Sequence, residues 1–205
     1  MLFTSLAVAT LSAVASAKTI RIDVGQSGLA FTPNDIKASV GDILEFHYHP
    51  KNHSVVAADF ATPCKPKAEG GFYSGFFPTA SGENENVFQV EVNNTTPIWF
   101  YCSQTVMNHC GAGMVGVVNA NTSSTKTFET FQAAAKKVTT NESPSTGNSF
   151  GGKILAAPSS TTSGGGSSAT SGAPASASTT NAAAALGSVS GMAMAVVGAA
   201  VAFAI

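Results

Sequence analysis

Short segments in which apolar and polar residues alternate, separated by turn residues, run through the first 120 positions of the chain. Such alternation is typical of half-buried β-strands. It is clearest at residues 19–24, 43–48 and 87–92, whereas residues 98–101 form an apolar run typical of a strand buried on both faces. Clusters of Gly, Asn and Pro separate these segments and predict turns. About seven such strands predict an all-β fold, a Greek-key β-sandwich.

The charged residues limit the folded part of the chain to one domain. All 10 basic and 11 acidic residues lie between Lys18 and Lys153, with the two signs interspersed. A net charge of −1 gives no support for binding to nucleic acid. Residues 126–138 place good helix formers at helical spacing, so we expect a short helix after the strands. We therefore place one folded domain at residues 18–138.

The two segments that flank this domain have the composition of processing and linker sequences. Residues 1–17 are apolar and short and end in a small-x-small site, which predicts a secretory signal peptide. Residues 139–181 consist mostly of Ser, Thr, Gly, Ala and Pro. Such a composition buries too little apolar surface to offset chain entropy, so we expect a disordered, O-glycosylated stalk.

The last segment, residues 182–205, is apolar and built largely from small residues. A small-residue site followed by a spacer and a hydrophobic tail is typical of a GPI-attachment signal. Asn181 is our candidate for the attachment residue, with Ser176 and Ser178 as alternatives. A plain C-terminal membrane helix is the competing interpretation. In either case we expect an extracellular protein held at the cell surface or cell wall.

Three metal-ligand side chains lie close together in residues 97–119. Cys102 directly follows one apolar segment, His109 lies in the next loop, and Met114 directly precedes another apolar segment. A second imidazole is available upstream at His53. Two imidazoles, one thiolate and a weak thioether make up the ligand set of a blue-copper electron-transfer centre. The sequence therefore predicts one copper site.

At these residues the chain resembles the cupredoxins, in particular the plant phytocyanins and the serine-rich, surface-anchored cupredoxin-like proteins of fungi. The matching pieces are Asn52-His53-Ser54-Val55, Tyr101-Cys102, His109-Cys110 and Gly113-Met114-Val115. The resemblance covers roughly residues 19–120. It implies a cupredoxin-like sandwich in which His53, Cys102, His109 and Met114 bind copper. The six residues between Cys102 and His109 depart from the plant proteins, which have four or fewer, and are similar to the fungal group.

The chain has three cysteines, so one is left over in any disulfide scheme. The resemblance implies a disulfide between Cys64 and Cys110, with Cys102 as the free thiolate. The alternative is a bond between Cys102 and Cys110 that leaves Cys64 unpaired. The resemblance also gives the Ser54 hydroxyl a hydrogen bond near the thiolate, tying the two ligand loops together.

Other polar residues receive simpler interpretations. His47 and His49 fall on the polar side of the strand at 43–48, where we expect them to be solvent-exposed; an accessory metal site is the alternative. Glu83 and Glu85 lie among Ser, Gly and Asn residues and are interpreted as solvated turn charges rather than a catalytic pair.

Five asparagines stand in glycosylation sequons. Our candidates for N-linked glycans are Asn93, Asn94, Asn121 and Asn141. We expect no glycan at Asn52, because it adjoins the proposed ligand His53.

Three functions follow from these observations. The first is a monomeric, membrane-tethered electron carrier with one blue copper and an unknown redox partner. The second is a copper-binding protein that buffers the ion, with His47 and His49 as possible additional ligands. The third is a metal-free cell-wall or adhesion glycoprotein. Four protein ligands leave no open position for a substrate, so we expect a carrier or binding protein and not an enzyme.

Overall fold

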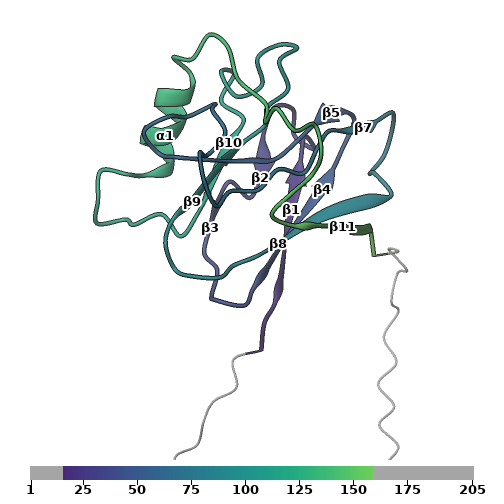
Figure 1. Cartoon of the computed structure of the whole chain (residues 1–205), viewed down its shortest axis with the longest axis horizontal. Coiled ribbons are helices and arrows are strands. Elements are labelled where there is room, and N and C mark those ends of the chain that lie inside the picture. The colour runs from purple at the N-terminus through teal and green to yellow at the C-terminus, as the bar shows by residue number, and fades with distance from the viewer. Residues whose placement is uncertain (1–15, 159–205) are drawn as a thin grey trace, which may run out of the picture. The chain divides into compact units, whose positions relative to one another are not determined.

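In the computed structural model, residues 16–158 are described, and most of their regular structure is β-strand. One sheet contains, in spatial order, β11 (Lys153–Ala156), β8 (Asn86–Glu91), β4 (Ile43–Tyr48), β1 (Thr19–Val24) and β2 (Phe31–Thr32). The second contains β3 (Asp35–Ile36), β10 (Val115–Val118), β9 (Ile98–Tyr101) and β6 (Val56–Ala58). A separate two-stranded ladder pairs β5 (Lys51–His53) with β7 (Phe77–Thr79). Figure 1 shows how these elements are arranged.

The core lies between the two sheets. Leu44, Phe46 and Phe88 point inward from the first sheet and Phe100 from the second, and all four are fully buried. The rings of Phe46 and Phe100 meet edge to face with centroids 5.6 Å apart. Burying each such side chain stabilises the fold by roughly 1.5–3 kcal/mol. The alternating segments thus form the strands as expected, and the predicted all-β sandwich is confirmed.

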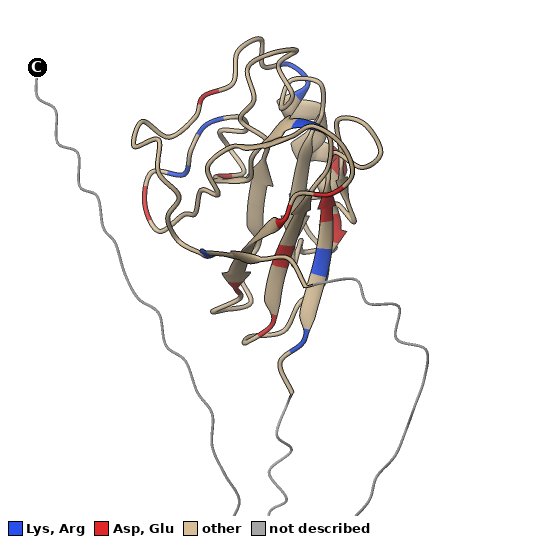
Figure 2. Ribbon diagram, turned by 90° about the vertical axis from the view of Figure 1, so that its right-hand side faces the viewer, with Lys and Arg blue, Asp and Glu red and all other residues tan. Residues whose placement is uncertain are grey.

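Two pairs of strands run parallel within these sheets. Strand β1 pairs in parallel with β4, and β10 pairs in parallel with β3, while the other strand neighbours are antiparallel. The β1–β4 register places Arg21 beside Glu45 and Asp23 beside His47. Acidic and basic positions therefore lie side by side on neighbouring strands, as Figure 2 shows.

The helix expected at residues 126–138 is present but shorter. Helix α1 (Phe128–Ala135) begins after Thr127, whose side chain accepts a hydrogen bond from the Thr130 backbone while Thr130 bonds back to the Thr127 backbone. This reciprocal pairing satisfies N–H groups that have no partner inside the helix. Phe131 is fully buried and contacts Trp99 of β9, with ring centroids 4.8 Å apart. The helix thus packs on the second sheet.

The folded domain continues beyond its predicted end at residue 138. The backbones of Phe150 and Tyr73 exchange two hydrogen bonds of 2.9 Å, and β11 then pairs antiparallel with β8. The sequence instead predicts that residues 139–158 belong to the disordered stalk. All four side chains of β11 are exposed, so no alternation marks it as a strand. It is held in the fold by its backbone hydrogen bonds to the edge of β8.

Several predicted segments lie outside the described residues. These are nearly all of the signal peptide, the stalk from residue 159 onward, Asn181 and the attachment signal at 182–205. Within residues 16–158, no helix has both the length and the hydrophobicity needed to span a membrane.

Candidate metal centre

The three strongest predicted ligands converge in the folded chain. The Cys102 Sγ lies 3.4 Å from His109 Nδ1 and 3.9 Å from His53 Nδ1. One ligand atom from each residue lies within 4.8 Å of the other two, and all three residues are buried. Nitrogen and sulfur ligands roughly 2 Å from a shared ion stand at about this separation from one another. The donor set and its spacing therefore fit a single metal ion.

Backbone hydrogen bonds bring Met114 to the same place. The Cys102 N–H donates to the Met114 carbonyl at 3.1 Å, and the Met114 N–H donates to the His109 carbonyl at 3.0 Å. Met114 is fully buried, whereas Met107, the other methionine of this loop, is 76% exposed. Of these two methionines, Met114 is therefore the better candidate for the weak fourth ligand.

His53 is positioned by a strand that the sequence did not predict. It ends β5 and pairs with Phe77 of β7. Its Nε2 lies 3.3 Å from the Pro50 carbonyl, so an N–H at Nε2 donates there and the lone pair of Nδ1 faces Cys102. Gly25 permits this ring position, because a Cβ on Gly25 would lie 2.3 Å from His53 Nε2.

Burial makes all three ligand side chains neutral in the metal-free protein at neutral pH. It raises the pKa of the Cys102 thiol, against a smaller opposing effect of hydrogen bonds from the Gln104 and Ser54 backbones. It lowers the pKa of His109 to about 4, assisted by the neighbouring His53, and it also lowers the pKa of His53. Neutral imidazoles are ready to bind a metal, while the thiol must lose its proton as a cation arrives.

Ser54 occupies the role that the resemblance implied. Its N–H lies 3.4 Å from Cys102 Sγ, and its hydroxyl lies 3.9 Å from the same sulfur and 2.9 Å from the Ser103 hydroxyl. The Ser103 N–H also donates to the Ser54 hydroxyl. The loop that carries His53 is thus bonded directly to the segment that carries Cys102, which fixes the separation of their ligand atoms.

A further support comes from Asn141 and Ser143, which sequence analysis placed in the stalk. The Asn141 Nδ2 donates to the carbonyls of Cys102 at 3.2 Å and Gln104 at 2.9 Å, and the Ser143 hydroxyl bonds that of Ser103. Asn141 is only 6% exposed. Because a glycan would be attached at this buried Nδ2, the predicted glycan at Asn141 does not fit the structure. Only the sequon drew attention to this residue.

A disulfide joins Cys64 to Cys110, and Cys102 remains a free, buried cysteine. This is the pairing that the resemblance implied, and the alternative bond between Cys102 and Cys110 does not occur. The disulfide fixes the residue next to His109 to the segment around Cys64, and both half-cystines are fully buried. It leaves the Cys102 sulfur available to a metal.

The expected solvent exposure of His47 is wrong. This residue is 1% exposed; its Nε2 lies 2.6 Å from Glu45 and its Nδ1 lies 2.5 Å from Glu83. Arg21 bonds the same Glu83 at 2.7 Å, so Glu83 is not simply a solvated turn charge. The parallel pairing of β1 with β4 completes this network, because it brings Arg21 to 2.9 Å from His47 Nδ1. The alternation within one strand could not show it.

His49 also differs from its predicted exposure. Its side chain is 12% exposed, and its Nε2 lies 2.8 Å from Asp23. Glu85, in contrast, is exposed as expected. The polar face of β4 is therefore covered by its own ionic partners.

Comparison with known proteins agrees with this geometry. Residues 32–114 match the plastocyanin-like domain family. The chain is 40% identical over 141 residues to a protein of Arthroderma benhamiae named "Probable GPI-anchored cupredoxin-1", covering 68% of this chain and 70% of that one. It is 34% identical over 149 residues to an "Extracellular serine-rich protein" of the same organism, covering 72% of this chain and 57% of that one. The chain belongs to the cupredoxin family.

Among solved structures, the chain is similar to auracyanin A of Chloroflexus aurantiacus, which is titled a "blue" copper protein. The sequence identity is 14%, the TM-score is 0.38, and the match covers 51% of this chain and all of the other. The predicted resemblance to cupredoxins is confirmed by the relative that is 40% identical to this chain.

Proposed function

We propose that this protein is an extracellular, cell-surface electron carrier with one type 1 (blue) copper ion bound by His53, Cys102, His109 and Met114. The observation that carries the proposal is the convergence of two neutral imidazoles on one buried free thiol. Copper bound there would supply one-electron transfer between Cu(I) and Cu(II). A thiolate suits Cu(I) and imidazole suits both oxidation states, so the ligand set supports repeated cycling.

The chain's own residues hold these ligands in a fixed arrangement. The Cys64–Cys110 disulfide fixes one side of His109, and the Ser54 hydrogen bonds fix the Cys102 segment to the His53 loop. Full burial keeps water away from the Cys102 sulfur and from Met114. A site that is dry and already ordered needs little rearrangement when its charge changes, which favours electron transfer.

An apolar hollow beside the two histidines supports exchange of electrons at this end of the molecule. It is lined by His53 and His109 together with Leu29, Pro50, Pro78, Val106 and Met107. Val106 and Met107 are among the most exposed large apolar side chains in the described part of the chain. A partner that docks on this apolar surface would lie against the rings of the two ligand histidines.

Cell-surface placement is supported by two kinds of observation. The names of the two A. benhamiae proteins state a GPI anchor for one and an extracellular location for the other. The predicted signal peptide at residues 1–17 and attachment signal at 182–205 give this chain the same two features. We therefore propose that the domain stands outside the cell, attached through a lipid.

The test is a titration of the secreted protein with Cu(II), followed in the visible range and by calorimetry. The proposal predicts one equivalent bound and an intense blue absorption band from the Cys102 thiolate. Tight but colourless binding would instead indicate a copper buffer. No binding would favour the third function, a metal-free surface glycoprotein, which requires only the fold, the predicted stalk and the predicted anchor.

A further inference from the structure

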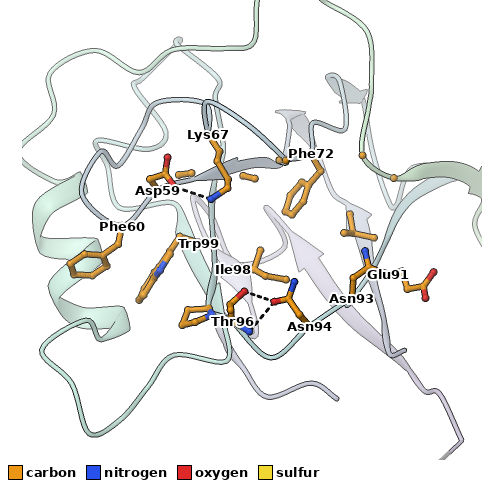
Figure 3. Close-up of a pocket in the computed structure, with 18 of the residues that line it drawn as sticks. Asp59, Phe60, Lys67, Phe72, Glu91, Asn93, Asn94, Thr96, Ile98 and Trp99 are labelled. Carbon is orange, nitrogen blue, oxygen red and sulfur yellow. Dashed lines mark hydrogen bonds and ion pairs between the residues drawn. The ribbon is translucent and has the colours of Figure 1, made fainter. Parts of the chain in front are cut away.

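A cavity of about 780 Å³ lies at the opposite end of β9 from the metal centre. Ile98, the first residue of β9, lines it, whereas Cys102 follows the last residue of that strand. Its volume is in the range of roughly 300–1,000 Å³ that is typical of small-molecule sites. Figure 3 shows the cavity and the side chains that surround it. Nothing in the proposed electron-transfer function uses this site.

The lining combines an apolar floor with polar walls. Phe72, Ile98 and Trp99 provide the apolar surface, and Glu91 borders it on one side. Gln89 also lines the cavity. Across from them Asp59 and Lys67 form an ion pair of 2.9 Å. Lys126 and Lys153 also line the cavity, so charges of both signs surround it and no single sign of ion is favoured. A neutral ligand with an apolar face and many hydroxyl groups matches such a surface, and a sugar has both features.

One wall of the cavity is made largely of backbone. Gly70, Gly71, Gly151 and Gly152 line it, and Ala57 adds only a methyl group. A Cβ on Gly152 would lie 2.4 Å from the Phe88 ring, and one on Gly151 would lie 2.4 Å from the Gly71 carbonyl oxygen. The glycines therefore allow close packing behind the wall, and they leave the space in front of it open.

A glycosylation sequon forms part of the rim. Asn94 and Thr96 of the sequon Asn94-Thr95-Thr96 both line the cavity. The Asn94 Oδ1 accepts hydrogen bonds from the backbone N–H of Thr96, at 2.9 Å, and from the Thr96 hydroxyl. These bonds fix the side-chain amide and leave Nδ2, the atom that carries an N-linked glycan, on the other side. In Figure 3 this nitrogen is on the side of Asn94 that faces the cavity.

The other sequons lack this combination. Asn141 is buried with its Nδ2 already bonded. Asn93 also lines the cavity, but it has no comparable turn among the described hydrogen bonds. Asn121 is exposed and has the same turn, with its Oδ1 accepting the Ser123 N–H at 2.9 Å, but it lines none of the cavities in residues 16–158. Asn121 is thus a natural control for Asn94.

We propose that Asn94 carries an N-linked glycan whose first N-acetylhexosamine units lie in this cavity. The bond forms between Asn94 Nδ2 and the anomeric carbon of a lipid-linked oligosaccharide diphosphate; Nδ2 loses one proton and the lipid diphosphate leaves. The apolar ring faces and acetyl methyl groups then cover Ile98 and Phe72. The hydroxyl groups meet Gln89 and Glu91.

Trp99 makes the proposal measurable, because it is the chain's single tryptophan and it lines the cavity. The secreted protein is produced in a glycosylating host, and its glycans are mapped by peptide mass spectrometry. Native protein is then treated with a peptide N-glycosidase while glycan release and Trp99 emission are followed. Thr96→Ala removes the Asn94 sequon and keeps that of Asn93, Thr95→Ala does the reverse, and Asn121→Gln removes a glycan without a cavity.

The proposal predicts a glycan on Asn94 that is released roughly tenfold more slowly than the one on Asn121. This ratio corresponds to about 1.4 kcal/mol of favourable interaction between the glycan and the cavity. Its release, or Thr96→Ala, shifts the Trp99 emission, whereas Thr95→Ala and Asn121→Gln do not. An unmodified Asn94 overturns the proposal, and so does release at the Asn121 rate with unchanged emission. Should Asn94 be unmodified while added N,N′-diacetylchitobiose shifts the emission, the cavity binds free sugar instead. None of these outcomes depends on copper.

Discussion

Two clusters in the described part of the chain contain buried histidines and differ in chemistry. One joins His53 and His109 to the Cys102 thiol, and the other joins His47 to Glu45 and Glu83. In the first, the Nδ1 atoms face a neutral sulfur and have no charged partner. In the second, both nitrogens of His47 already face carboxylates. Burial of imidazoles is common to both, so what separates a metal centre from a structural network is whether the lone pairs are already used.

The same distinction applies to Asp23, His49 and Glu83, whose ligand atoms also lie within 4.8 Å of one another. Arg21 bonds Asp23 at 2.5 Å and Glu83 at 2.7 Å, so a guanidinium already provides the positive charge that a metal ion would bring. A metal would have to displace it. Asp23, His49 and Glu83 are therefore a poor site for copper buffering, although their residue types suggest one.

The largest expected effect comes from Cys102→Ser. Removing the only free thiol should abolish the blue band completely, because the band requires a copper–thiolate bond. Glu45→Gln, which alters the second cluster, should leave the band unchanged. Visible spectra of both variants with one equivalent of Cu(II) check this. A blue Cys102→Ser protein would break the comparison, since the colour would then arise elsewhere.

The next effect should come from Glu45→Ala, which changes stability without changing copper binding. Glu45 is 7% exposed and accepts hydrogen bonds from Gln89 and His47, each at 2.6 Å. Its loss leaves buried donors unpaired, at a cost of about 1–3 kcal/mol in the free energy of unfolding. Urea denaturation measures this. The exposed Glu85→Ala is the control and should stay within about 0.5 kcal/mol of the parent; equal effects of the two would refute the network.

Asn141→Ala tests how far the metal centre depends on the segment that follows α1. Two carbonyl groups lose their donor, so we expect about 1 kcal/mol of destabilisation. The metal-free protein should also show faster reaction of Cys102 with a thiol reagent, because the carbonyl of Cys102 itself is released. Ser149→Ala in the same segment is a useful control. An unchanged thiol reaction rate would show that Asn141 does not support the ligand loop.

The smallest effects should be seen in the pH dependence of the metal-free protein. The pKa of His109 is lowered to about 4, so its contribution to stability is full above the unfolded pKa near 6.5 and is lost as pH falls toward 4. Desolvation raises the pKa values of Asp23 and Glu83, but bonds to Arg21 and the histidines outweigh it and lower them. Their contribution is present above about pH 4 and is lost below it.

Urea midpoints measured from pH 7 to pH 3 separate these two windows. His109→Ala should flatten the curve between about pH 6.5 and pH 4, and Arg21→Gln should flatten it below about pH 4. If both variants changed the same window, the two clusters would be electrostatically coupled and the comparison would fail.

The sequence predicted the parts of this molecule that follow from side-chain pattern. Alternation found β1, β4 and β8, and residue type together with the family resemblance named His53, Cys102, His109 and Met114. It missed β5 and β7, which are three residues long and too short for a periodic signal, and β11, whose side chains are all exposed. These strands exist because backbone groups of distant segments pair.

The polar networks were harder to predict for the same reason. Arg21 reaches His47 only because β1 and β4 are parallel neighbours, and Asn141 reaches Cys102 only because the chain returns after α1. Neither contact leaves a local mark in the sequence. Residue types therefore predict which side chains can bind a metal, but only the tertiary contacts show which of them are already paired.

The exposed edge strand β11 has a mechanical consequence. Any pull on the chain beyond residue 158 enters the domain through four residue pairs between β11 and β8. Only when that ladder and the two backbone bonds between Phe150 and Tyr73 have separated does the load reach Asn141 and Ser143, and through them Cys102 and Ser103. The short strand β11 therefore separates first under force and protects the ligand loop from a pull on the C-terminal part of the chain.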